Sequence, residues 1–123
     1  MSTAFHHLAD LLQARCIRAH DALDAADVAR LLPLVPGWSI ANGKLVRGFA
    51  FKNYHETMAF VNALAWISHS EDHHPELTVT YKNCVVRYDT HSVNNGAGGL
   101  SDNDFICAAK AGALLGTDVK DAA

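Results

Sequence analysis

The stretch Glu71-Asp72-His73-His74-Pro75 separates two different patterns of hydrophobic residues. Residues before it follow helical spacing, and residues after it alternate as in a strand. Proline lacks a backbone donor and disfavours the helical conformation of the residue before it, so this stretch should lie at a helix exit. Two adjacent histidines there have two interpretations: a polar surface loop, or a site of proton transfer, because imidazole titrates near neutral pH.

The helix before this stretch is predicted to begin after Asn53, which forms a capping-box pattern with Glu56. Trp66 falls off the apolar face of this helix, and we expect it at a helix edge covered by a loop or by another subunit. The residues predicted to form the apolar face are Met58, Phe60, Val61, Leu64, Ala65 and Ile67.

Two hairpins are predicted on either side of this helix. The dipeptide Asn42-Gly43 separates strands at 38–41 and 45–51 and suits a two-residue turn, because both positions accept positive φ. After the histidines, a strand containing Leu77, Val79 and Tyr81 is followed by a turn at 82–83 and a strand over 84–90. We expect Tyr81 to face the core.

Shorter helices are predicted over 23–32, where Pro33 and Pro36 end the pattern, and after Ser101, with Asp104 at the third position. The predicted fold class is α+β: a four-stranded antiparallel sheet with helices packed on one face. We expect residues 1–21 to form an N-terminal extension, which is either a short helix or frayed. Residues 22–116 form the domain, and residues 117–123 form a disordered tail.

Composition limits the functional classes. The chain has 123 residues, half of them hydrophobic, with a net charge of −3 and no basic run, so nucleic acid is not expected as a partner. No apolar run approaches the roughly 20 residues that span a bilayer, so no membrane partner is expected. The three cysteines, Cys16, Cys84 and Cys107, have no CxxC spacing, which favours a reducing cytoplasmic location.

Several spaced motifs resemble the pterin-4a-carbinolamine dehydratase family over about residues 22–115. The matching segments are Gly37-Trp38, Asp72-His73-His74-Pro75-Glu76, Thr90-His91 and Gly99-Leu100-Ser101 with Asp104. The resemblance implies dehydration of 4a-hydroxy-tetrahydropterin to quinonoid dihydropterin and water, in pterin cofactor recycling. It implies no cofactor and no metal, because histidines can give and take the protons.

The resemblance also implies a role for each site residue. His73 and His91 serve as the acid/base pair, and His74 binds and orients the substrate. The remaining substrate-binding residues are His69, Asp72, Pro75 and Trp38, with Asp104 supporting the site. Three of these residues keep a second, structural interpretation: Asp104 as a helix cap, Asp72 as a closing residue of the helix exit, and Trp38 as a buried hairpin residue.

The chain departs from the family pattern at three places. His69 stands where many members have a glutamate, the loop after His91 is a few residues longer, and residues 1–20 lie outside the match. The implied partners are a pterin, further copies of the chain in a dimer or tetramer, and an aromatic amino acid hydroxylase.

Two alternatives stay open. One is a metal site built from His69, His73 and His91, although HExxH is absent. The other is a protein-binding module, because relatives of this family also act as dimerisation cofactors for a homeodomain transcription factor.

Overall fold

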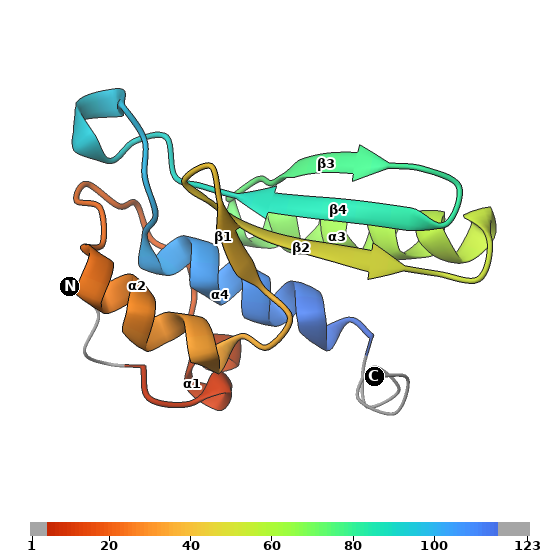
Figure 1. Cartoon of the computed structure of the whole chain (residues 1–123), viewed down its shortest axis with the longest axis horizontal. Helices are drawn as coiled ribbons and strands as arrows, with labels where there is room; N and C mark the ends of the chain where they lie inside the picture. The colour runs from red at the N-terminus through yellow and green to blue at the C-terminus, as the bar shows by residue number, and fades with distance from the viewer. Residues whose placement is uncertain (1–4, 116–123) are drawn as a thin grey trace.

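The computed structural model describes residues 5–115, in which one antiparallel sheet carries helices on one face (Figure 1). Its strands, in spatial order, are β1 (Ser39–Ala41), β2 (Lys44–Ala50), β4 (Asn83–Tyr88) and β3 (Glu76–Val79). The helices α3 (Tyr54–Glu71) and α4 (Asp102–Ala113) pack against each other beneath the sheet. The α+β prediction is therefore confirmed.

The first hairpin has the predicted turn. Asn42 and Gly43 have φ values of 53° and 75°, and Ala41 pairs with Lys44 across the turn. Positive φ at both central positions matches the right-handed twist of the strands, which is why this dipeptide is favoured there. The turn fixes the register in which β1 pairs with β2, and β2 pairs with β4 along its other edge.

Helix α3 begins and ends where the local sequence predicts. The Asn53 side chain accepts a hydrogen bond from the Glu56 backbone N–H at 2.9 Å. The Glu56 carboxylate accepts from the Lys52 N–H instead of completing the box on Asn53. At the other end Asp72 is left-handed with φ 51°, and the His73 N–H donates to the Ser68 carbonyl. The chain therefore leaves the helix just before the histidine pair.

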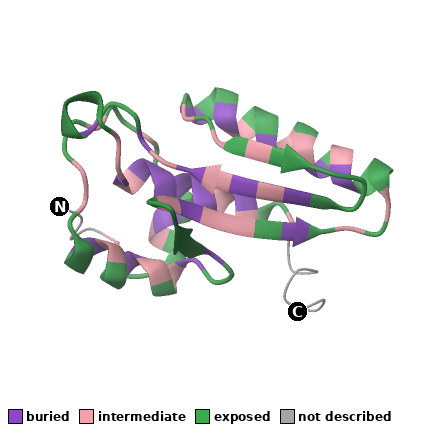
Figure 2. Ribbon diagram, turned by 45° about the horizontal axis from the view of Figure 1, so that its top comes forward, coloured by how far each residue is buried: buried purple, intermediate pink, exposed green. Residues whose placement is uncertain are grey.

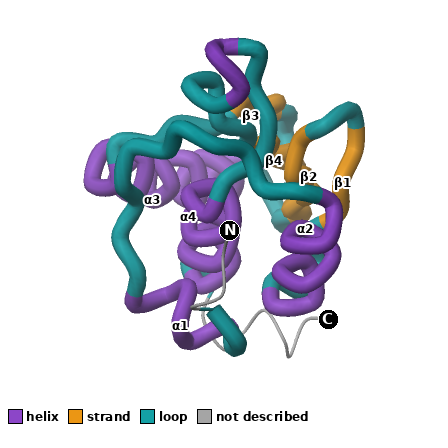
Figure 3. The backbone as a smooth tube through the Cα atoms, turned by 90° about the vertical axis from the view of Figure 1, so that its left-hand side faces the viewer, coloured by secondary structure: helices purple, strands orange, loops and turns teal. Residues whose placement is uncertain are grey.

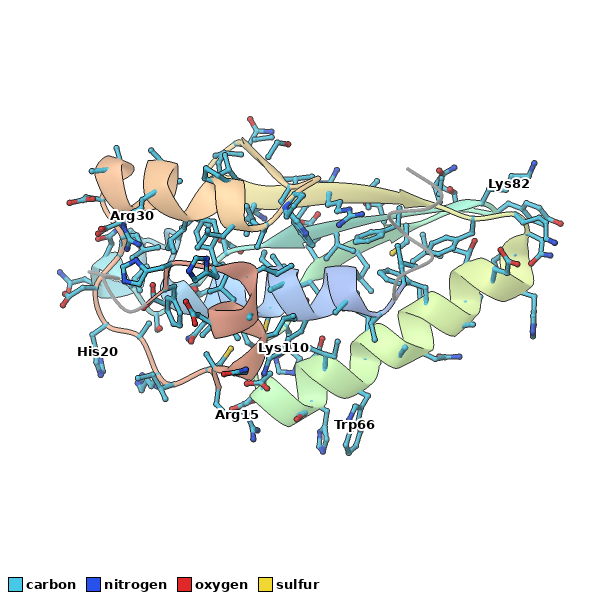
Figure 4. The ribbon with its side chains drawn as sticks, turned by 90° about the horizontal axis from the view of Figure 1, so that it is seen from below. Arg15, His20, Arg30, Trp66, Lys82 and Lys110 are labelled. Carbon is cyan, nitrogen blue, oxygen red and sulfur yellow. The ribbon has the colours of Figure 1, made fainter. Side chains whose placement is uncertain are left out.

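Burial corrects two details of the prediction (Figure 2). Ala65 is exposed, whereas Thr57 and Glu71 of the same helix are buried. Tyr81 is 61% exposed because β3 ends at Val79, so the strand alternation no longer applies. Trp66 is 69% exposed and points away from the body of the chain (Figure 4).

The N-terminal part of the chain lies over α4. Helix α1 (Leu8–Gln13) packs on α4, and α2 (Ala25–Leu31) continues into the 3₁₀ turn η1 (Leu32–Leu34). The connection between α1 and α2 passes the end of α3 and crosses the N-terminal end of α4 (Figure 3). The predicted tail at 117–123 lies outside the described residues, and the domain boundary at residue 22 remains a prediction.

The loop after β4 contains the 3₁₀ turn η2 (Asn94–Gly96). Backbone hydrogen bonds between Thr90 and Gly99 close the base of this loop. Among the residues that the structure describes, no helix is long and apolar enough to cross a membrane.

Candidate active site

The carboxylate of Asp104 connects the start of α4 to the histidine pair. Its Oδ2 accepts hydrogen bonds from the Ser101 backbone N–H at 2.9 Å and from the Thr90 hydroxyl at 2.8 Å. Its Oδ1 lies 2.6 Å from Nε2 of His73. Asp104 is fully buried, so these contacts replace the hydration that the carboxylate loses. It is at once the capping-box residue of α4 and the partner of His73.

His73 is held on its face as well as at its edge. The Tyr88 ring stacks on the imidazole, with centroids 5.8 Å apart and an interplanar angle of 11°. Tyr88 is itself fully buried, and burial raises the pKa of its hydroxyl. The His73 side chain is 11% exposed. One imidazole edge is therefore fixed, while a small part of the ring stays open.

That open part faces a pocket of about 380 Å³. His91 has fewer contacts than His73: its side chain is 86% exposed, and its Nε2 lies 3.3 Å from Oδ1 of Asp89. Three parts of the chain supply the walls: Asp72, His73 and His74 after α3; Thr90 and His91 after β4; and residues 16–19 with Asn103. The pocket thus brings three histidines together.

Three residues predicted to bind substrate do not line this pocket. Trp38 is 6% exposed and packs against Phe49 and Tyr88, which agrees with its structural interpretation as a hairpin core residue. His69 lies on the exposed side of α3, with its ring 5.8 Å from that of Trp66. Pro75 shapes the exit of the chain from α3 and does not contact the pocket.

Glu71 is a site neighbour that sequence patterns missed. Its side chain is 4% exposed and contacts Nε of Arg15 at 3.0 Å and Nζ of Lys110 at 2.7 Å (Figure 4). Burial would raise the pKa of Glu71, but hydrogen bonds from the Cys16 N–H and from Lys110 outweigh it and lower the pKa to about 2. Its partners lie far away in the sequence, so no local pattern signals them.

The alternative metal site is not assembled. Within residues 5–115, no three histidine, cysteine or acidic side chains are grouped so as to hold a metal ion. His73, which that site would need, already has its Nε2 against Asp104. The residues that the structure brings together are arranged for hydrogen bonding.

Fold and pocket define a small α+β protein in which a buried carboxylate orients one of three clustered histidines. The family model described as pterin 4 alpha carbinolamine dehydratase matches residues 21–114. A Stenotrophomonas maltophilia protein is 57% identical over 112 residues, covering 87% of this chain and 93% of its own. A Bdellovibrio bacteriovorus protein is 50% identical over 107 residues, covering 87% of this chain and 89% of its own. Both carry the name "Putative pterin-4-alpha-carbinolamine dehydratase".

A solved structure shows the same fold. The crystal structure of a transcriptional coactivator/pterin dehydratase from Brucella melitensis matches with a TM-score of 0.70 and 28% identity, covering 78% of this chain and all of that one. The chain belongs to the pterin-4a-carbinolamine dehydratase family.

Proposed function

We propose that this chain dehydrates 4a-hydroxy-tetrahydropterin to quinonoid dihydropterin and water by histidine acid/base catalysis. The observation that carries the proposal is the 2.6 Å contact of His73 with the buried Asp104, at the edge of a pocket shared with His74 and His91. A group that must exchange a proton in a defined direction needs a fixed orientation, which this contact supplies.

The reaction needs one proton donor and one proton acceptor. The C4a–O bond breaks as its oxygen is protonated and leaves as water, and a base removes the proton on N5 as the N5–C4a double bond forms. We assign His73 and His91 to these two transfers and His74 to substrate binding, with Asp72 beside them and Asp104 as the positioning residue. Imidazole can perform either transfer near neutral pH.

A pterin dehydration assay on the purified chain tests this proposal. We expect His73→Ala and His91→Ala each to lower kcat by roughly 10²–10⁴, the usual scale for a lost general acid or base. His74→Ala should act mainly on KM, because a contact made equally in the ground and transition states changes binding. The double variant of His73 and His91 should cost far less than the product of the single effects.

His55→Ala is the matched control, because His55 is an exposed histidine of α3 that does not line the pocket. It should keep wild-type kinetics. A wild-type chain that does not accelerate dehydration would refute the proposed activity. A His91→Ala variant with normal kcat would remove His91 from the mechanism and leave His73 and His74 as the acid/base residues.

A second candidate function is that of a protein-binding module, because the structural neighbour from Brucella melitensis is described as a transcriptional coactivator as well as a pterin dehydratase. Trp66 on α3 is 69% exposed, which leaves a large aromatic side chain open to contact with another protein or another copy of the chain. The assay above separates the two candidates, since a module without dehydratase activity would leave the substrate at its uncatalysed rate.

The remaining parts of the proposal concern partners and location. We propose a homo-oligomer, a dimer or tetramer, which a measurement of mass in solution tests. An aromatic amino acid hydroxylase that releases the hydroxylated pterin would be the functional partner, in the cytoplasm. The N-terminal extension at 1–21 and the domain at 22–116 are the proposed divisions of the chain.

A further inference from the structure

One wall of the pocket comes from residues outside the family match. Cys16, Ile17, Arg18 and Ala19 line the same pocket as the histidines, whereas the family model matches residues 21–114. These four residues belong to the connection that crosses the N-terminal end of α4 (Figure 3). A wall of this kind matters for the substrate only if the chain holds it in a defined place.

Glu71 forms the first attachment of the segment at residues 16–19 to the rest of the chain. The Cys16 N–H donates to Oε1 of Glu71 at 2.8 Å, and Nζ of Lys110 contacts both Oε2 of Glu71 and the Ala14 carbonyl at 2.7 Å. Arg15 completes the cluster, lying beside Lys110 at the end of α3 (Figure 4). A buried carboxylate satisfied by charged and backbone donors gives a defined geometry, because each donor lost would leave charge unpaired.

The second attachment is at Asn103. Its amide oxygen accepts from the Ile17 N–H at 3.1 Å, and its amide nitrogen donates to the Ile17 carbonyl at 2.6 Å. One side chain therefore holds both backbone groups of a single residue, as a neighbouring strand would. Asn103 is 7% exposed, so it makes these bonds away from competing water.

Both Glu71 and Asn103 lie next to the His73–Asp104 pair in the sequence. Glu71 precedes His73 by two residues, and Asn103 immediately precedes Asp104. The segment is thus positioned by the same two helix ends that position the His73–Asp104 contact. Its placement relative to the reacting histidine follows from short covalent connections.

Ile17 is the side chain that this arrangement leaves open. It is 77% exposed although both of its backbone groups are bound, and it lines the pocket. A large aliphatic side chain held at a pocket wall offers apolar surface to a ligand, and binding would remove that surface from water. A reduced pterin is a compact bicyclic ring with apolar faces and polar edges.

We propose that residues 16–19 form part of the substrate site and that Ile17 packs against one face of the bicyclic ring of the bound pterin. This inference rests on the proposed function, since it assigns the ligand of the same pocket. The histidines then contact the ring near C4a and N5, while the N-terminal wall limits which ring shapes fit. Ile17 acts in binding and orientation and transfers no proton.

Ile17→Ala tests the inference, because removing an exposed side chain leaves the folded structure intact. We expect KM to rise roughly tenfold, on the scale of lost apolar contacts in a binding pocket, with kcat within about twofold. The dissociation constant of 7,8-dihydrobiopterin, which has no hydroxyl at C4a and so cannot be dehydrated there, should rise by the same factor in a direct titration. Ile17→Val should retain most of the affinity.

Ile40→Ala is the matched control, because Ile40 is an exposed isoleucine of β1 that does not line the pocket. If the wild-type chain catalyses dehydration and Ile17→Ala has the same KM and pterin affinity as wild type, the inference is overturned and the proposed function stands. A wild-type chain that binds 7,8-dihydrobiopterin through Ile17 but does not catalyse dehydration would support the inference and refute the proposed function. Failure of wild type to bind this pterin would overturn the inference.

Discussion

The Asp104 carboxylate makes three contacts, and each comes from a different part of the chain: the N-cap residue Ser101 of α4, Thr90 after β4, and His73 after α3. A neutral amide can keep the shape of this group but cannot accept from all three donors with both of its terminal atoms. The orientation of His73 therefore depends on the carboxylate form of this one side chain.

We expect Asp104→Asn to lower kcat by roughly tenfold or more with little change in KM, because a misoriented imidazole loses part of the usual acid/base contribution. Steady-state kinetics of the purified variant measure both quantities. Asp102→Asn is the matched control: it lies in the same first turn of α4 and does not line the pocket. Equal effects of the two substitutions would reduce the role of Asp104 to helix capping.

At the residue scale, sequence and structure agree where a motif is local. His73 and His74 follow a helix exit that proline and the left-handed Asp72 mark, so their position could be predicted. Trp38 and His69 were assigned by resemblance to substrate binding, and the structure places both outside the pocket. Glu71 and Asn103 were missed, because their partners in residues 15–17 are 55 or more positions away.

Among the elements, the first hairpin gives a direct test of backbone conformation. Gly43 has φ 75°, and a Cβ atom built there would meet nothing within 4 Å. We therefore expect Gly43→Val to lower the free energy of unfolding by about 1 kcal/mol or more through backbone strain alone. Thermal or urea denaturation measures this change, and the kinetics of the folded variant should stay normal.

Gly48→Val is the control that distinguishes backbone strain at Gly43 from the effect of adding a valine side chain. Gly48 lies within β2, has no positive φ, and also has open space around a built Cβ atom. Valine favours the extended conformation, so this variant should be neutral or slightly stabilised. If both variants lose the same stability, the Gly43 effect does not come from the turn.

The elements themselves were largely predictable because each has its own start and stop signals. The Asn53 cap, the Asn42-Gly43 turn and the Ser101 capping box act within four residues and leave a local trace. Which side of α3 is buried was less predictable. Ala65 is exposed and Glu71 is buried, since burial depends on what packs against the helix from residues 14–17 and α4.

For the molecule as a whole, the lowered pKa of Glu71 predicts that the free energy of unfolding decreases in acid. Its pKa is lowered in the folded chain to about 2 from an ordinary value of 4.5. A lowered folded-state pKa means that the stabilisation is present above pH 4.5 and is lost as pH falls toward 2. The charged groups that face its carboxylate are Lys110 at 2.7 Å and Arg15 at 3.0 Å.

Glu71→Gln should therefore melt roughly 5 °C or more below wild type near pH 7, and this difference should shrink as pH falls from about 5 to 2. Thermal melts at several pH values measure it. Glu76→Gln is the control, because Glu76 pairs with Lys44 at 2.9 Å on the surface, where an ion pair contributes little. A difference between wild type and Glu71→Gln that is independent of pH would show that packing, not charge, is responsible.

Lys110 connects parts of the chain that are far apart in the sequence, and this affects the order in which the chain folds. Lys110 reaches back 96 positions to the Ala14 carbonyl and 39 positions to Glu71. During synthesis, residues 14–19 are made early but have no lasting place to bind until α4 has been made and docked. Contacts between distant positions are also the slowest to form. We therefore expect the hairpins and α3 to assemble first and the pocket beside His73 to close last.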